Sequence, residues 1–137
     1  MEIPKISLKM AEKAVQKHQF KIKAGKFYSK KQQKEADAFE KKHSFRFEDA
    51  WNLDNSIACF ILPRLVYLRK VGNGMPASFA TEFGGGGEEA WDEILKTMIY
   101  GFYLYITKED FDFTEEEKEI WKETKELFIE YFESLWW

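Results

Sequence analysis

The chain has 137 residues, a net charge of -3 at neutral pH and an aromatic fraction of 18%. A chain of this length is expected to form one domain with a buried core. Its apolar runs are shorter than the about 18 to 20 residues of a membrane span, its first ten residues lack the hydrophobic stretch of a signal peptide, and its single cysteine, Cys59, cannot form a disulfide within the chain. These features argue against a membrane-spanning or disulfide-built secreted protein and predict a cytoplasmic one.

Charge is distributed unevenly along the chain. Residues 1–46 hold 13 Lys and Arg against 5 Asp and Glu, whereas residues 47–137 hold 8 against 19. This division predicts a basic N-terminal helical arm, residues 1–46, attached to an acidic helical core domain, residues 47–137. A basic arm of this kind attracts polyanions or the acidic half of a neighbouring chain.

Aromatic residues are numerous, with 13 Phe, 6 Tyr and 5 Trp. Large aromatic side chains dominate both protein cores and protein interfaces. One small domain cannot easily bury all of them, which favours a homo-oligomer. A core that is simply rich in Phe is the alternative.

The arm is predicted to contain two helices. A weakly amphipathic helix covers residues 6–20, with Met10 and Ala14 among its apolar positions. Ser29 followed by Gln32 forms a capping-box pattern that opens a polar helix from Lys30 to about residue 42. A helix this polar gains little from burial, so it is expected to be exposed or to dock on a partner.

The core domain begins with an apolar helix whose start is marked by two possible N-caps, Asn52 and Asp54. Pro63 lacks a backbone donor and clashes with the carbonyl of Cys59, so a kink is expected in the middle of this helix. A Gly-Asn-Gly run at residues 72–74 favours a left-handed cap at its end. Apolar residues recur at spacings of 4, 4 and 3 on one face, namely Ile57, Ile61, Leu65 and Leu68.

The rest of the chain is predicted to form a Gly-rich loop, residues 72–87, and two more helices. A long helix starts at Glu88, and Thr114 with Glu117 opens the last helix through a capping box. The two tryptophans at residues 136 and 137 are expected to pack on something or to form a frayed end. The predicted fold is all-α, a compact bundle of four or five helices with a Pro-kinked central helix.

No catalytic constellation is evident in the sequence. The only histidines, His18 and His43, lie in the basic segment, and neither an HExxH pattern, a Cys pair nor a G-x-S-x-G motif occurs. The glycines at 84–87 lack the Lys-Ser/Thr of a phosphate loop, and the following Glu88 would repel phosphate. Hydrolysis by paired carboxylates rests only on the abundance of acids. The sequence therefore predicts a protein that is not an enzyme and has no metal site and no cofactor.

Cations and flat rings in the central region are the candidate ligand-binding groups. The cations are Arg64, Arg69 and Lys70, and the rings that could stack on bases are Trp51, Trp91 and Tyr100. Two further polar residues could read a base edge, Asn52 and Asp54, although capping is their commoner use. Arg64 follows Pro63 in an apolar run, so it is expected to be half-buried and paired, either with an internal acid such as Asp54 or with a ligand phosphate.

Four strings in the region from Phe47 to Ile106 carry a resemblance to a known family. They are Trp51-Asn52-Leu53-Asp54, the run from Ile57 to Leu65, Gly74-Met75-Pro76, and the run from Trp91 to Ile99 with Phe102. Together they resemble a widespread family of small proteins of tailed bacteriophages, which is similar to the phage anti-CBASS sponges. Those sponges are tetramers that capture 3′3′-cGAMP, a cyclic dinucleotide that signals infection in bacterial defence. The basic arm and the acidic last helix lie outside the resemblance.

The resemblance implies immune evasion by sequestration, without cleavage, of a cyclic dinucleotide in the host bacterial cytoplasm by a homotetramer. It does not identify the residues of the pocket. The alternative is a phage inhibitor or adaptor that binds a host protein through the arm and the aromatic C-terminus. A phosphodiesterase lacks the metal and histidine constellation, and sequence-specific nucleic-acid binding is opposed by the acidic core domain. If a phosphate binds at Arg64, then Arg64→Ala is expected to abolish nucleotide binding.

Overall fold

The computed structural model describes residues 2–24, 29–72, 74–82 and 86–136, and these residues form helices and no strand. The seven α-helices are α1 (Leu8–Ala24), α2 (Lys30–His43), α3 (Phe47–Trp51), α4 (Leu53–Val71), α5 (Ala77–Glu82), α6 (Gly87–Thr107) and α7 (Glu115–Glu130). Two short 3-10 helices, η2 (Asp110–Asp112) and η3 (Phe132–Ser134), follow α6 and α7. The predicted all-α class is confirmed.

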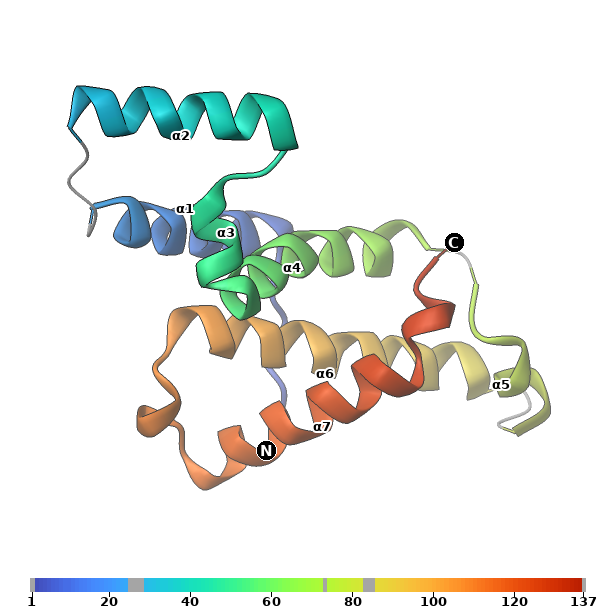
Figure 1. The fold of residues 1–137 in the computed structure, drawn as a ribbon. Helices are drawn as coiled ribbons and strands as arrows, with labels where there is room; N and C mark the ends of the chain where they lie inside the picture. The colour runs from blue at the N-terminus through green and yellow to red at the C-terminus, as the bar shows by residue number, and fades with distance from the viewer. Residues whose placement is uncertain (1, 25–28, 73, 83–85, 137) are drawn as a thin grey trace.

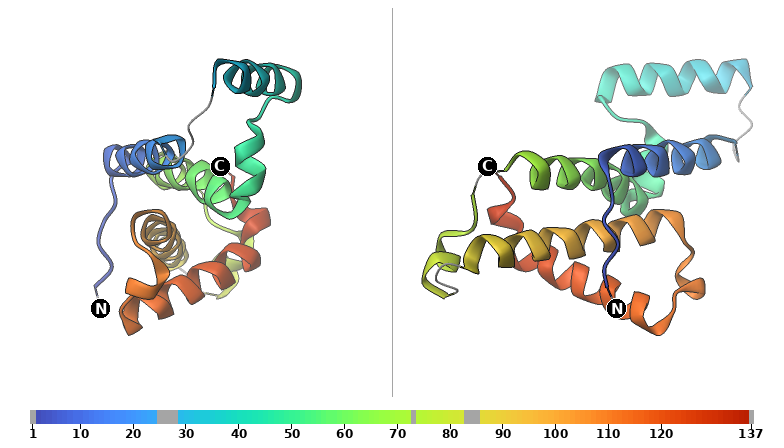
Figure 2. Two further views of the ribbon diagram at one scale, coloured as in Figure 1. Left: turned by 60° about the vertical axis from the view of Figure 1, so that its left-hand side comes forward. Right: turned by 180° about the vertical axis from the view of Figure 1, so that it is seen from behind.

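The helices form three layers around α6 (Figure 1). Helices α1 and α4 lie side by side above α6, and α7 runs beneath it (Figure 2). The N-terminal segment descends past α6 toward α7, and the C-terminal segment rises from α7 to the end of α4. This return of the chain places the last residues beside the C-terminal end of α4.

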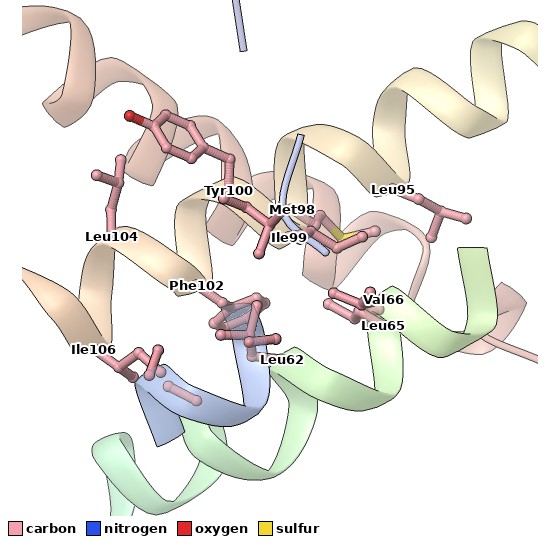
Figure 3. Packing of buried hydrophobic residues seen from close by; sticks show 14 of the residues in the cluster. Leu62, Leu65, Val66, Leu95, Met98, Ile99, Tyr100, Phe102, Leu104 and Ile106 are labelled. Atoms are coloured by element: carbon pink, nitrogen blue, oxygen red, sulfur yellow. The ribbon is translucent and has the colours of Figure 1, made fainter. Parts of the chain in front are cut away.

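The core lies between α4 and α6 (Figure 3). Leu62 and Leu65 of α4 meet Met98 and Phe102 of α6, and all four side chains are buried. Of the apolar face predicted for this helix, Leu65 and Leu68 are buried and Ile61 is half-buried, but Ile57 is 46% exposed, so the prediction was wrong for Ile57. Pro63 lies inside α4, which continues through it to Val71. The kink expected at this proline stays a prediction.

The two helices of the predicted basic arm differ in their packing. Ala11 and Ala14 of α1 belong to the core, whereas α2 stands apart from the layers and is joined to them through α3. The junction contains the Phe39 ring, which meets the rings of Phe45 and Phe47 edge-on at 5.5 and 6.0 Å between centroids, and an ion pair of 3.1 Å between Glu40 and Arg46. The exposed helix expected in the arm is thus α2, while α1 forms part of the core.

The two capping boxes predicted from residues three positions apart are both present in the structure. In α2 the Ser29 hydroxyl accepts from the Gln32 amide, and in α7 the Thr114 hydroxyl accepts from the Glu117 amide, each with the reciprocal bond in place. Asn52 stands at the N-cap of α4, but its side chain makes no capping hydrogen bond. Of the two possible N-caps, Asn52 is therefore the one that stands at that position, and Asp54 lies in the first turn.

Helix α4 ends at Val71 as predicted, and Gly72 follows it in an extended conformation with φ -64°. Asn73, where a left-handed cap would stand, lies outside the described residues, so that cap stays a prediction. The prediction of one continuous loop up to residue 87 was wrong. The segment predicted as a continuous loop contains α5, whose Phe79 is fully buried. This ring packs edge-on against Trp91 and Tyr131, so contacts distant in sequence stabilise a helix of only six residues.

The buried Glu117 makes the stability of the α6–α7 connection dependent on pH. Its carboxylate accepts from the Thr114 amide and lies 2.6 Å from Lys108 Nζ, and the hydrogen bond from Lys108 holds its pKa below the usual 4.5. A carboxyl whose pKa is lowered by folding contributes stability that is complete above its unfolded pKa and is lost as pH falls through the folded pKa. Between about pH 6 and about pH 3, the free energy of unfolding should fall less for Glu117→Gln than for the parent protein, as measured by urea titrations at each pH. An equal dependence of the free energy of unfolding on pH in the two proteins would contradict the assignment to Glu117.

Candidate functional site

A pocket of about 260 Å³ opens where the end of α4 meets the start of α6. The C-terminal segment closes one side of it, because the chain returns there after α7. Its lining combines apolar, aromatic and charged groups: Leu68, Arg69, Gly72, Gly74, Glu88, Trp91, Asp92, Leu95 and Trp136. Three chain segments that are far apart in sequence therefore contribute to one concave site.

An ion pair spans this pocket from α4 to α6. Arg69 Nε donates to Asp92 Oδ1 at 2.8 Å and Arg69 Nη2 donates to Asp92 Oδ2 at 3.0 Å. This two-pronged contact raises the pKa of the guanidinium and holds the pKa of the Asp92 carboxyl below its usual range. The Arg69 side chain is 19% exposed and that of Asp92 48% exposed, so the carboxylate faces solvent more than the guanidinium does.

Two indole rings border the same pocket in different ways. Trp91 is buried and packs edge-on against Phe79 and Tyr131, with centroids 5.9 and 5.6 Å away. It therefore forms a fixed wall. Trp136 is 74% exposed and forms the rim. Trp137, the other tryptophan expected to pack, lies outside the described residues.

Of the residues predicted to bind ligand, the structure brings Arg69 and Trp91 together in the pocket. Lys70 is exposed and does not line the pocket. Trp51, Asn52 and Asp54 lie at the opposite end of α4.

Those three residues form no joint site in the described structure. Trp51 is exposed and meets the Phe47 ring edge-on at 5.1 Å, and Asn52 is half-buried at the junction of α3 and α4. Asp54 accepts a hydrogen bond from the Tyr105 hydroxyl, which lowers the pKa of the Asp54 carboxyl. Burial together with this bond raises the pKa of Tyr105 to about 12.

Arg64 is exposed, so the expectation of a half-buried cation was wrong. Its Nη1 donates to the backbone carbonyl of Phe60 at 2.8 Å, and its guanidinium carbon lies 3.7 Å from the centre of the Phe60 ring. Within the described part of the chain no carboxylate pairs with it, because Asp54 is engaged with Tyr105 instead. Position 64 belongs to the outer face of α4, opposite the buried Leu62 and Leu65.

Tyr100 also lies away from the pocket. It is buried on the face of α6 turned away from α4 (Figure 3), and this burial raises the pKa of its hydroxyl. Its ring is therefore part of the interior and closed to a stacking base.

Cys59 is buried, and burial raises the pKa of its thiol to about 11, which opposes formation of the reactive thiolate. Among the residues that the structure describes, there is no cluster of three His, Cys, Asp or Glu suited to a metal ion. None of the helices described is long and apolar enough to span a membrane.

Comparison with known proteins identifies no relative of this chain. No family model matches the chain, and neither a curated protein nor a solved structure is significantly similar to it.

Proposed function

We propose that this protein is a phage immune-evasion protein that binds 3′3′-cGAMP in the host bacterial cytoplasm and sequesters it intact, as a homo-oligomer. The observation that carries the proposal is the pocket that joins the Arg69 guanidinium with the indoles of Trp91 and Trp136. A cyclic dinucleotide offers two phosphates and two purines, which require cations and flat rings.

The geometry of Arg69 suits a phosphate. Its guanidinium already presents two parallel donors to a carboxylate, and the same fork matches two oxygens of a phosphate. The exposed face of Trp136 can stack on a base, a contact worth about 1–3 kcal/mol. Trp91 supplies an apolar wall that keeps the bound group dry.

The size of the pocket limits what one chain can enclose. Its volume of about 260 Å³ lies just below the about 300–1,000 Å³ of sites that surround a whole drug-sized molecule. One nucleotide unit therefore enters the pocket, and the other lies against the rim at Trp136 or against a neighbouring copy. This arrangement is compatible with the homotetramer implied by the sequence resemblance.

Carboxylates in the pocket oppose an anionic guest and set how it binds. Asp92 occupies the fork of Arg69, and Glu88 lines the same pocket. A phosphate must therefore displace the Asp92 carboxylate to reach the guanidinium. In the protein without nucleotide, Asp92 holds the Arg69 guanidinium in its orientation. In the complex, the phosphate of the nucleotide would hold it instead.

Replacing Asp92 with asparagine is therefore expected to strengthen binding of 3′3′-cGAMP by about tenfold, or ~1.4 kcal/mol. The change keeps the side-chain shape and removes the charge that competes for Arg69 and repels the phosphate. Isothermal titration calorimetry measures the effect. Glu93→Gln is the matched control, because Glu93 is the exposed neighbour on α6 and lies outside the pocket lining. Weaker binding by Asp92→Asn would contradict the idea that the carboxylate competes with the phosphate for Arg69.

A calorimetric titration with a panel of cyclic and linear dinucleotides tests the function itself. We expect tight binding of 3′3′-cGAMP, and recovery of the intact nucleotide after the complex is denatured by heat and separated by chromatography. Recovery of a cut product would make the protein a phosphodiesterase. No heat with any cyclic nucleotide would refute the proposal and favour the alternative, an inhibitor that binds a host protein.

A further inference from the structure

The outer face of α4 carries a stripe of large side chains. Residues at spacings of 4, 3, 4, 3 and 4 form it, and we call it the α4 outer stripe: Leu53, Ile57, Phe60, Arg64, Tyr67 and Val71. Leu53, Ile57, Phe60 and Tyr67 are between 46% and 59% exposed. Spacings that alternate between 3 and 4 are typical of a seam along which two helices pack.

The opposite face of α4 is already occupied by the core. Leu62 and Leu65 are buried against α6, so α4 is apolar on both its inner and its outer side. A helix that is largely apolar on two faces is expected to be covered on both of them. Among the other exposed apolar residues, Phe111 stands alone on η2, and Ile129, Phe132 and Trp136 form a shorter row that is divided between α7, η3 and the C-terminal segment.

We propose that a second copy of this chain covers the α4 outer stripe, with the two α4 helices antiparallel about a two-fold axis near residue 62. The stripe is symmetric about this point. An antiparallel copy sets Leu53 opposite Val71, Ile57 opposite Tyr67, and Phe60 opposite Arg64. Each pair occurs twice, which is the self-complementarity that a two-fold interface requires.

The single cation of the stripe fits this arrangement. Arg64 already lies over the Phe60 ring of its own helix, at 3.7 Å from the ring centre. In the antiparallel pair it also faces the Phe60 ring of the other copy, so each guanidinium lies between two rings. Cation–π contacts strengthen when water is excluded from them. A residue that is poorly suited to an apolar interface thus gains a partner there.

The charges at the ends of α4 favour the antiparallel direction. Asp54 lies in the first turn, and Arg69 and Lys70 lie in the last turn. Antiparallel packing brings the basic end of one α4 toward the acidic end of the other. It also aligns the two helix dipoles antiparallel, which is their favourable arrangement. Parallel packing would place like charges at both ends.

The available area is that of a weak but specific interface. Large side chains present about 150–250 Å² each, so the exposed parts of the four apolar stripe residues amount to about 400 Å² per copy. Two copies would bury about 800 Å², which is the area of a weak, transient association. The dimer is therefore expected to dissociate at micromolar concentrations.

This interface is separate from the proposed nucleotide site. The pocket lies at the C-terminal end of α4, so an axis near residue 62 places the two pockets toward opposite ends of the paired helices. Dimerisation through the stripe therefore does not depend on nucleotide binding. Loss of nucleotide binding would leave the interface standing. A monomeric chain would overturn the interface and the homo-oligomer of the proposed function, but not nucleotide binding by the pocket itself.

Sedimentation velocity over a range of concentrations tests the interface. The parent chain should show a mass above that of one chain, and Phe60→Lys and Ile57→Ser should each reduce it by half or to a monomer. Ile129→Lys is the control on α7, where an apolar residue that is more exposed than either stripe position lies outside the stripe. All three positions are exposed, so circular dichroism and thermal melting should show folded proteins. A parent chain that stays monomeric, or stripe variants that keep the parent mass, would overturn the proposal.

Disulfide trapping tests the direction of packing. Ile57→Cys and Tyr67→Cys chains are mixed and treated with a mild oxidant, while the native Cys59 is buried and does not compete. Antiparallel packing should join a residue 57 to a residue 67 of the other chain, so that the mixture gives the cross-linked species in excess over either chain alone. Parallel packing would join like positions within each separate sample and would overturn the antiparallel arrangement.

Discussion

Gly101→Ala is expected to lower the free energy of unfolding by about 2 to 3 kcal/mol, although alanine normally stabilises a helix relative to glycine. Gly101 lies where α6 crosses α7, and a Cβ atom at this position would stand 1.8 Å from Thr124 Oγ1 and 2.5 Å from Thr124 Cβ. Thr124 is fully buried, and its hydroxyl donates to the Ile120 carbonyl at 2.7 Å, so it cannot turn away. The helices must separate to admit the methyl group. Urea unfolding followed by circular dichroism measures the loss.

The partner residue supplies the controls for this prediction. Thr124→Ala keeps the Cβ that would lie 2.5 Å away and should not rescue Gly101→Ala, whereas Thr124→Gly should rescue it in part. Gly74→Ala is the matched substitution in open space, where no atom lies within 4 Å of the new Cβ, and it should change stability little. A Gly101→Ala protein as stable as the parent would show that α6 and α7 are less tightly apposed than described.

Arg69→Ala is expected to weaken binding of 3′3′-cGAMP by about 100-fold or more. Hydrogen bonds to a charged group contribute about 1.5–3 kcal/mol each, and the variant removes the two-pronged donor while leaving Asp92 and Glu88 to repel the phosphate. Stability should change little, because a partly exposed ion pair contributes about 1 kcal/mol or less. Calorimetric titration measures the loss of binding, and thermal melting verifies the fold.

Two variants make the result specific to the pocket. Arg64→Ala removes the same side chain from the same helix at a position outside the pocket, so binding should be unchanged. This reverses the expectation drawn from the sequence, in which Arg64 was the residue to hold the phosphate. Arg69→Lys keeps the charge without the fork and should bind with intermediate affinity. Parental affinity in Arg69→Ala would remove Arg69 from the site.

Sequence patterns predicted those parts of the fold that depend on neighbouring residues. The capping boxes at Ser29 and Thr114 were found because their partners lie three positions away. Helix α5 was missed because Phe79 is buried by Trp91 and Tyr131, which no local pattern connects to it. The helical class was predictable from periodicity, whereas the order of the layers was not.

The candidate site was predicted only in part for a related reason. Arg64 was expected to be half-buried because apolar residues surround it in sequence, but α4 is apolar on two faces and periodicity does not tell which one meets the core. The pairing of Arg69 with Asp92 joins residues 23 positions apart on two helices, so the sequence showed both groups without showing their contact. Trp91 was identified as an aromatic candidate, and the structure assigns it to the wall of the pocket.

The thin attachment of α2 has a consequence for local dynamics. Its only buried position among the described residues is Ala36, and the rings around Phe39 join it to α3 rather than to the layered core. Local opening of a protein requires least free energy where few apolar contacts must break. The amide protons of α2 should therefore exchange with solvent through detachment of that helix alone. The amide protons of α4 and α6 should exchange only through global unfolding.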